Sequence, residues 1–278
     1  MQNIVAAVIA FWCLTAGLEP PGHFAAGLAP PKHGGVYVVA HRGAHEGIPE
    51  NTLPAYARAI ELGADFVEID VRTTKDGRLV SIHNASVESY AEGHSGRVAE
   101  MTYDELRALD VGARIAPEWV GTRIPLVEDI LDLCRNKIGI YLDLKAGDVA
   151  TLVDMVKERG MEKQVLWYAS LSKLRELEKS CPSCIAMPDP GPEKNLKKLI
   201  AAFQPAVVAS VWRHYSKSFV DTVHDAGAIV IVDEDDPGCW EDALKWKSDG
   251  IQTDHPAALI EWLAQNRQNG LDSPPRKP

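Results

Sequence analysis

Two histidines and two basic side chains are residue types that acid–base chemistry on an anionic group would use. His41 is followed at once by Arg42, and His83 follows a short apolar run. An imidazole titrates near neutral pH, so it can take a proton and later return it. A guanidinium matches two phosphate oxygens at once, and Lys145 adds a compact positive charge.

Three carboxylates supply ligands for a metal ion. Glu68 and Asp70 are two residues apart in an apolar run, so on a strand both side chains would point to one face. Asp143 lies on a later strand, which we expect to be nonadjacent, and would complete the set. Unpaired inward carboxylates repel one another and are costly to desolvate. The alternative is ion pairing with nearby basic residues, Arg42, Arg72 and Lys145.

A divalent cation would remove the cost of burying these carboxylates. An all-oxygen ligand set suits Mg²⁺ or Ca²⁺ better than Zn²⁺. We therefore expect one divalent cation, Mg²⁺ or Ca²⁺, as the cofactor.

Strand-like and helix-like segments alternate along most of the chain. The strand candidates are residues 36–40, 66–71, 79–83, 138–144, 164–168, 184–187, 206–210, 228–232 and 250–253. Helices are expected at 52–62, 102–109, 126–136, 149–159, 171–179, 196–203, 217–226 and 241–247. Such alternation predicts an α/β fold with a parallel sheet, and about eight units favour a single-domain (β/α)8 TIM barrel.

One connection departs from this pattern. Between Val71 and Leu79 the chain carries only a turn at Asp76-Gly77, which is too short for a crossover helix. The barrel should therefore be irregular near its second and third strands, and one of the strand candidates should lie outside it. The polar residues above follow or occupy the first four strands, whose carboxyl ends would meet at one mouth.

The ends of the chain suggest the bounds of the domain and its localisation, and the net charge bears on its partners. Residues 4–18 form an apolar run typical of a signal peptide, and a Pro/Gly linker extends to residue 35. The domain should span 36–268, followed by a disordered tail at 269–278. We expect a periplasmic, secreted or membrane-tethered protein, with a cytoplasmic one as the alternative. A net charge of −10 argues against a nucleic-acid partner, no membrane span is expected in the mature domain, and the oligomeric state stays open.

Cys181 and Cys184 form a C-x-x-C pair. They follow a helix-like run, whereas a redox pair should open a helix after a strand. We interpret them as a structural pair, disulfide-bonded if the protein is exported.

An ordered series of motifs resembles the signature of the glycerophosphodiester phosphodiesterase family. The matching segments are His41-Arg42-Gly43, Pro49-Glu50-Asn51-Thr52, Glu68-Ile69-Asp70-Val71, Thr74-Lys75-Asp76-Gly77, Leu79-Val80-Ser81-Ile82-His83, Leu142-Asp143-Leu144-Lys145 and Thr253-Asp254-His255-Pro256. The resemblance runs from about Val36 to Pro256 and implies a TIM barrel. It also implies metal-dependent hydrolysis of a glycerophosphodiester, a small molecule, to sn-glycerol 3-phosphate and an alcohol, through a cyclic phosphate.

The resemblance implies a role for each candidate residue. His41 and His83 would be the general acid and base. Arg42 and Lys145 would bind the phosphate. The metal ligands and the supporting residues would be Glu68, Asp70 and Asp143, with Glu50 and Asn84.

Three positions differ from the usual family pattern. Asn84 stands where an Asp is common, and Asp143 where a Glu is common. Residues 232–236, Val-Asp-Glu-Asp-Asp, replace a Trp-Thr-Val-Asn segment. If Asp233, Glu234 or Asp235 lines the mouth, it would favour a cationic leaving group such as choline or ethanolamine; otherwise this run is a solvated loop.

Two other functions stay open. A phospholipase D- or C-like lyase would act on (lyso)phospholipids, release a cyclic phosphate and need apolar loops at the mouth, for which Trp119 and Trp212 are candidates. A non-catalytic phosphodiester-binding barrel would keep the fold without the reaction. His255 is expected to border the mouth. The remaining histidines of the domain are expected on the surface or in loops: His45, His94, His214 and His224.

Overall fold

The computed structural model describes residues 27–268, so the apolar run at 4–18 and the tail at 269–278 lie outside the described residues. Within that range eight parallel strands form a nearly closed barrel in the order β6-β5-β4-β2-β1-β9-β8-β7. The strands are β1 (Tyr37–Ala40), β2 (Phe66–Thr73), β4 (Gly139–Leu144), β5 (Val165–Tyr168), β6 (Ile185–Ala186), β7 (Val207–Val211), β8 (Ile229–Asp233) and β9 (Gly250–Thr253). Ala209 on β7 donates to the Pro188 carbonyl just after β6, which draws the two open edges together. The expected TIM barrel is confirmed.

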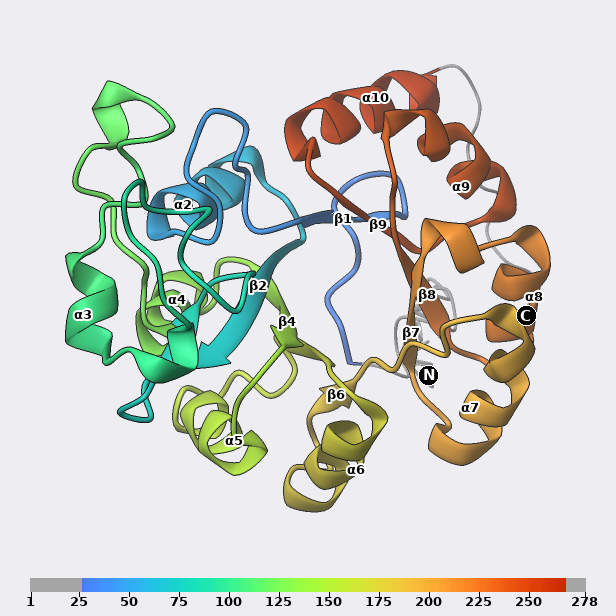
Figure 1. Ribbon diagram of the computed structural model, residues 1–278. Coiled ribbons are helices and arrows are strands. Elements are labelled where there is room, and N and C mark those ends of the chain that lie inside the picture. The colour runs from blue at the N-terminus through green and yellow to red at the C-terminus, as the bar shows by residue number, and fades with distance from the viewer. Residues whose placement is uncertain (1–26, 269–278) are drawn as a thin grey trace, which may run out of the picture.

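Helices surround the strands (Figure 1). They are α2 (Leu53–Leu62), α4 (Val127–Cys134), α5 (Val149–Glu158), α6 (Leu171–Ser180), α7 (Leu196–Phe203), α8 (Lys217–Asp225), α9 (Trp240–Trp246) and α10 (Pro256–Gln268). The sequence analysis did not predict α10. Its buried Leu259 and Leu263 are four residues apart on one helical face and pack into the core beneath it.

Alternating strand residues divide the core into two layers. Val38 and Ile69 point outward and pack against the helices. Tyr37, Val39 and Phe66 point inward and fill the barrel. Because side chains alternate along a strand, the inward positions after Phe66 on β2 are Glu68 and Asp70. The apolar filling therefore gives way to carboxylates towards the carboxyl end of that strand.

The ninth strand lies outside the barrel, as the short turn before Leu79 predicted. β3 (Leu79–Ser81) pairs antiparallel with β2, and Ser81 lies opposite Val71. Residues 82–126 then form an insertion with α3 (Tyr103–Ala108) and a small apolar core of its own, beside α2 and α4 (Figure 1). Because β3 lies off the barrel, β2 pairs directly with β4, so our expectation that Asp143 comes from a nonadjacent strand was wrong.

Residues just before the barrel also contact it. Leu28 is buried. The Lys32 backbone donates to Asp65 at 2.9 Å, and His33 Nε2 lies 2.8 Å from the Gly63 carbonyl. Segment 28–35, placed in the linker from sequence, is thus attached to the amino-terminal side of the strands.

The C-x-x-C pair is oxidised. Cys181 and Cys184 form a disulfide at the end of α6, as expected for a structural pair. Among residues 27–268, none of the helices combines the length and the apolar character that crossing a membrane requires.

Gly43 is required where the chain leaves β1. It has φ +84°, and an added Cβ would lie 2.8 Å from the backbone carbon of Ala55 in α2. Gly47 has a similar φ of +73° but nothing within 4 Å. Both Gly→Ala changes pay about 1–2 kcal/mol for a left-handed conformation, and Gly43→Ala adds overpacking of about 1–3 kcal/mol. Urea unfolding should therefore show Gly43→Ala to be the more destabilising by at least about 1 kcal/mol. Equal losses would contradict this account.

Candidate active site

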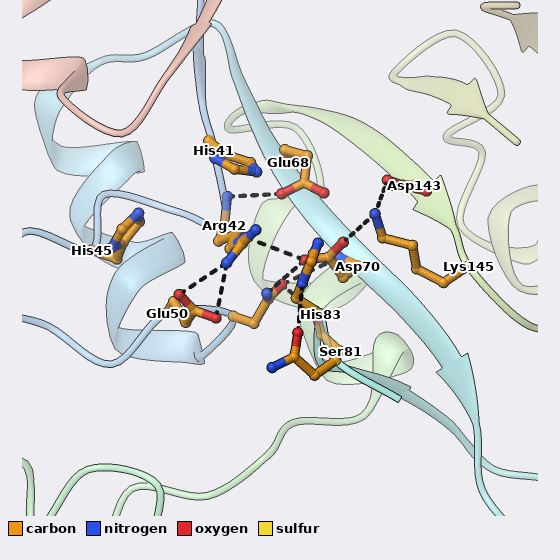
Figure 2. Close-up of polar contacts among 12 residues, drawn as sticks. His41, Arg42, His45, Glu50, Glu68, Asp70, Ser81, His83, Asp143 and Lys145 are labelled. Carbon is orange, nitrogen blue, oxygen red and sulfur yellow. Dashed lines mark hydrogen bonds and ion pairs between the residues drawn. The ribbon is translucent and has the colours of Figure 1, made fainter. Parts of the chain in front are cut away.

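The chain turns sharply after β1, and this turn begins the site. Arg42 is in the left-handed region at φ 53°, followed by Gly43. This conformation lets the backbone N–H of Arg42 donate to Glu68 Oε2 at 2.8 Å. The strand end therefore anchors one carboxylate through its backbone and presents the Arg42 side chain over the barrel mouth (Figure 2).

Glu68, Asp70 and Asp143 form one compact carboxylate cluster. Each contributes an oxygen that lies within 4.8 Å of the others'. Glu68 and Asp70 are buried, and Asp143 is the direct β4 neighbour of Asp70 on β2. The structure thus brings together the three residues that the sequence proposed as metal ligands.

Two cations compensate part of this charge. Lys145 Nζ lies 2.5 Å from Asp143 Oδ2 and 3.2 Å from Asp70 Oδ1. Arg42 Nη1 is 3.2 Å from both oxygens of Glu50, and its Nε is 3.7 Å from Asp70 Oδ2. The ion pairing considered as an alternative is thus present for Arg42 and Lys145.

Arg72, by contrast, takes no part in this pairing. Its guanidinium donates twice to the His83 carbonyl, at 2.6 and 3.0 Å, and so fixes the backbone of that histidine.

The cluster keeps an excess of negative charge that a metal ion would neutralise. When all four carboxylates are ionised, Glu50 included, the two basic side chains leave two negative charges without a counter-charge. Asp70 Oδ1 is buried and accepts no hydrogen bond, although the Lys145 ammonium lies nearby. Burial, followed by the charges of Asp70 and Asp143, raises the pKa of Glu68 well above its usual value. These observations fit a divalent cation held by the three oxygen ligands.

Two imidazoles lie beside the cluster (Figure 2). His41 Nδ1 is 2.7 Å from Asp254 Oδ1, and His83 Nδ1 is 3.0 Å from Asn84 Oδ1. Because both acceptors are oxygens, each Nδ1 is the donor, and Nε2 is left able to exchange a proton. Asn84 therefore orients His83, as its amide allows.

His83 reaches the mouth by a different route from the one we expected. We expected it at the carboxyl end of a barrel strand, but β3 runs antiparallel to β2 outside the barrel. The hairpin returns the chain towards the mouth, where the N–H of Ile82 donates to the Asp70 carbonyl. His83 thus lies at the mouth, as expected, but a hairpin outside the barrel places it there, not the end of a barrel strand.

Sequence reasoning missed the role of Asn51. This buried residue has φ 56°. Its Nδ2 donates to Asp70 Oδ2 at 2.8 Å, and its Oδ1 accepts from Tyr56 at 2.9 Å and Ser81 at 2.8 Å. Asn51 therefore orients Asp70. Asn tolerates a left-handed backbone better than most residues, which was the available signal within the Pro-Glu-Asn-Thr motif.

The sequence analysis also assigned no role to Asp254. This residue directly follows the end of β9, and a polar residue at the carboxyl end of a strand was the signal used for the other site residues. It accepts from His41 and, at 3.0 Å, from His45 Nε2. These hydrogen bonds lower the pKa of Asp254 far below its usual value. His45 lies in a loop, as expected, but it is close to the site because it shares a carboxylate with His41.

His94, His214 and His224 do not line the mouth, whereas His255 lines a cavity beside it together with His41 and Asp254. His224 pairs with Asp249 at 2.8 Å. His255 is bonded to Glu46 at 2.7 Å. His94 is exposed and His214 half-buried.

A cavity of about 240 Å³ opens at the mouth of the barrel. Its lining includes both catalytic candidates and residues from seven strands or strand ends: His41, Arg42, Glu68, His83, Tyr141, Asp143, Lys145, Tyr168, Asp189, Ala209, Ser210, Val211, Asp233 and Gln252. Of the acidic run, Asp233 lines this cavity. Glu234 accepts from Trp240 and Thr253, and Asp235 is exposed; both line an adjoining cavity of about 160 Å³ together with His41.

The raised pKa of Glu68 predicts how stability changes with pH in the presence of EDTA. The folded protein keeps a proton that the unfolded chain has already lost, so stability falls as pH rises above about 4.3, the usual pKa of Glu. Between about pH 5 and 8 the free energy of unfolding should decrease, and Glu68→Gln should make this decrease smaller by at least about 1 kcal/mol. Urea titrations across that range test this, and identical slopes for the two proteins would contradict it.

Known proteins that resemble this chain belong to one family. The model of the glycerophosphoryl diester phosphodiesterase family matches residues 41–258. A glycerophosphodiester phosphodiesterase of Caldanaerobacter subterraneus is 36% identical over 154 residues, which are 52% of this chain and 63% of that protein. A relative from Bacillus subtilis, a glycerophosphodiester phosphodiesterase, is 32% identical over 52% of this chain and 48% of its own length. The matches thus span less than two thirds of the length of these relatives.

Solved structures match over more of the chain. The glycerophosphodiester phosphodiesterase of Agrobacterium tumefaciens superposes with a TM-score of 0.72 at 26% identity, over 81% of this chain and 99% of that one. An Oleispira antarctica phosphodiesterase, solved with the product sn-glycerol-3-phosphate, has the same fold with a TM-score of 0.76 at 21% identity, over 82% of this chain and 96% of that one. Together with the family match over most of the barrel, these findings show that the chain belongs to the glycerophosphoryl diester phosphodiesterase family.

Proposed function

We propose that this protein hydrolyses glycerophosphodiesters to sn-glycerol 3-phosphate and an alcohol with the help of one divalent cation, Mg²⁺ or Ca²⁺. The observation that carries the proposal is one cavity that contains two oriented imidazoles, two phosphate-matching cations and a carboxylate cluster with excess negative charge. The family supports it, and so does the product bound in the Oleispira relative.

Arg42 and Lys145 would bind the phosphate. Both side chains stay positively charged. Burial lowers the pKa of each, but the carboxylates beside it together raise the pKa by more. These are chiefly Glu50 and Asp70 for Arg42, and Asp70 and Asp143 for Lys145. A permanently charged fork and an ammonium neutralise the equatorial oxygens as charge develops on them. A metal ion held by Glu68, Asp70 and Asp143 would, when bound, lower the pKa of a hydroxyl and stabilise charge on the phosphate.

The two histidines would divide the proton transfers. Asp254 carries a negative charge, which favours a positively charged His41 ring after it accepts a proton. Asn84 is neutral and orients His83 without such a charge. We therefore assign His41 as the base that takes the proton of the substrate's 2-hydroxyl, and His83 as the acid that protonates the leaving alcohol. A cyclic phosphate would form, and its hydrolysis would reverse the two roles.

The lipid-directed lyase is less well supported. Among residues 27–268 the exposed large apolar side chains are Val120 and Leu171. Trp212 stacks on Trp246, with ring centroids 5.3 Å apart, and Trp119 donates to the Gly47 carbonyl. An enzyme acting on membrane lipid needs a broader apolar surface around its mouth. The non-catalytic barrel is disfavoured because both imidazoles have oriented donors beside the carboxylate cluster.

The release of glycerol 3-phosphate from a panel of diesters tests the proposal. We expect turnover with Mg²⁺ or Ca²⁺ and its loss in EDTA. His41→Ala and His83→Ala should each lower kcat by about 10²–10⁴-fold, the usual contribution of an acid–base group. His94→Ala, which changes an exposed histidine, is the matched control. The proposal fails if no diester is hydrolysed with either metal, or if both site variants keep the wild-type rate.

Asp254 should matter through His41. Asp254→Asn would keep the shape but remove the charge that stabilises the protonated ring. We expect kcat to fall by about 10- to 100-fold with little change in KM, less than the loss of the imidazole itself. His45→Gln removes the second partner of Asp254 and should cost much less. Steady-state kinetics of both variants check this, and an equal loss in the two would show that Asp254 does not act through His41.

A further inference from the structure

The amino-terminal end of the barrel, opposite the mouth, is basic on one side. The loops that precede β1, β2, β4 and β5 are neighbours there, because these strands are consecutive in the sheet order β5-β4-β2-β1. Five basic and two acidic residues occur in these loops, which are residues 27–36, 63–65, 135–138 and 159–164. Of the two acidic residues, Asp65 is buried and accepts from the backbone of Lys32 and Val38. The excess charge of this end is thus positive, whereas the whole chain has a net charge of −10.

Three exposed lysines line one cavity at this end, and we call them the basic face: Lys32, Lys137 and Lys163. The cavity measures about 220 Å³, and its other lining residues include Leu28 and Phe66. Elsewhere many surface cations pair with a carboxylate of their own helix, but none of these three is ion-paired among residues 27–268. Lys32 Nζ donates to a backbone carbonyl at 2.8 Å. Three ammonium groups without counter-charges are therefore available to an anionic surface.

Hydrogen bonds between the loops fix the backbone that carries these lysines. Gln164 Nε2 donates to the carbonyls of Cys134 and Ile138, at 2.9 and 2.6 Å. Gln164 Oε1 accepts from the backbone of Asn136 at 3.2 Å, so the loops before β4 and β5 are joined. The hydroxyl of Tyr37 donates to the Ala29 carbonyl at 2.8 Å and attaches the segment before β1. Because the loops are already ordered, binding a partner costs little further backbone entropy.

The chain enters the barrel beside the basic face. A Cβ added at Gly27 would lie 3.5 Å from the Lys163 side chain. Residues 19–26 separate Gly27 from the apolar run at 4–18 and can span at most about 28 Å. That run is shorter than the roughly 20 residues that cross a bilayer. Stable attachment by a short apolar group requires a second contribution, for which a basic patch close to the bilayer suffices.

We propose that the basic face rests on a bilayer surface that contains anionic lipid, to which the apolar run at 4–18 attaches the same chain. The three lysines contact lipid phosphates, while the acidic remainder of the protein is repelled, so that charge alone orients the barrel. The mouth lies at the carboxyl ends of the strands and therefore opens away from the bilayer, towards soluble substrates. This docking is independent of the proposed diesterase reaction, because binding requires no turnover.

Sedimentation of the full-length protein with vesicles tests this docking. One set of vesicles is phosphatidylcholine alone, and the other is an equimolar mixture of phosphatidylcholine and phosphatidylglycerol. Both take up the apolar run, so the ratio of the two affinities isolates the electrostatic contribution. We expect the anionic vesicles to bind about 10- to 100-fold more tightly, since each lysine near the surface contributes about fivefold. The preference should shrink as salt is added, because salt screens exposed charges.

Removing the three lysines should abolish most of this preference. The variant Lys32→Gln/Lys137→Gln/Lys163→Gln should bring the ratio to within about threefold of one. Lys137→Gln/Lys163→Gln keeps the Lys32 hydrogen bond to the backbone and gives a second, smaller loss if the triple variant folds poorly.

A matched control removes the same charge from three exposed lysines that follow β2 and β6: Lys75, Lys194 and Lys197. Changing all three to Gln should leave the ratio within about twofold of wild type. An equal loss in the two triple variants would show that net charge acts and not the basic face, and equal binding of wild type to both vesicle types would also overturn the proposal. Tighter retention on duplex DNA than on anionic vesicles would assign the face to a different polyanion.

Discussion

The electrostatic cost of three carboxylates at the carboxyl ends of two neighbouring strands governs the rest of this site. Glu68 and Asp70 are buried, and Asp143 is their direct neighbour on β4. Carboxylates this close repel one another and lose hydration. Three neighbouring groups reduce that cost. The backbone N–H of Arg42 donates to Glu68, the Asn51 amide donates to Asp70, and the Lys145 ammonium lies between Asp70 and Asp143. The charge that still remains would attract a divalent cation.

The hairpin of β2 and β3 makes this arrangement possible. A regular barrel would insert a strand and a helix between β2 and β4. Here β3 folds back outside the barrel, which leaves β2 free to pair with β4 and places Asp70 opposite Asp143. The same hairpin returns His83 to the mouth, where Arg72 holds its carbonyl. One irregular connection therefore positions both the candidate metal ligands and one of the imidazoles.

The cavity at the mouth is lined by charged groups of both signs. Residues following β1 and β4 carry positive charge for a phosphate, and residues of β5 to β8 carry carboxylates and an aromatic ring. Of the acidic run after β8, Asp233 lines this cavity, whereas Glu234 is bonded to Trp240 and Thr253 and lines an adjoining cavity that His41 shares.

The sequence by itself determined the barrel and the chemical groups at its mouth. Alternating apolar runs define strands and helices locally, and the period of two places Glu68 and Asp70 on one face whatever surrounds them. What the sequence could not determine was which strands are neighbours, because pairing between strands depends on where a hairpin leaves the sheet. That is why Asp143 was expected on a nonadjacent strand, and why the reason given for His83 was wrong.

Only the tertiary structure decided the partners of the catalytic candidates. Asp254 and His45 are about two hundred residues apart in sequence, yet they are hydrogen-bonded to each other because β9 pairs with β1. Asn51 orients Asp70 through an amide whose contacts with Tyr56 and Ser81 come from a helix and a hairpin. Residue types and spacing identify the groups that can react, but side-chain hydrogen bonds between distant segments form only once packing has fixed the distances between them.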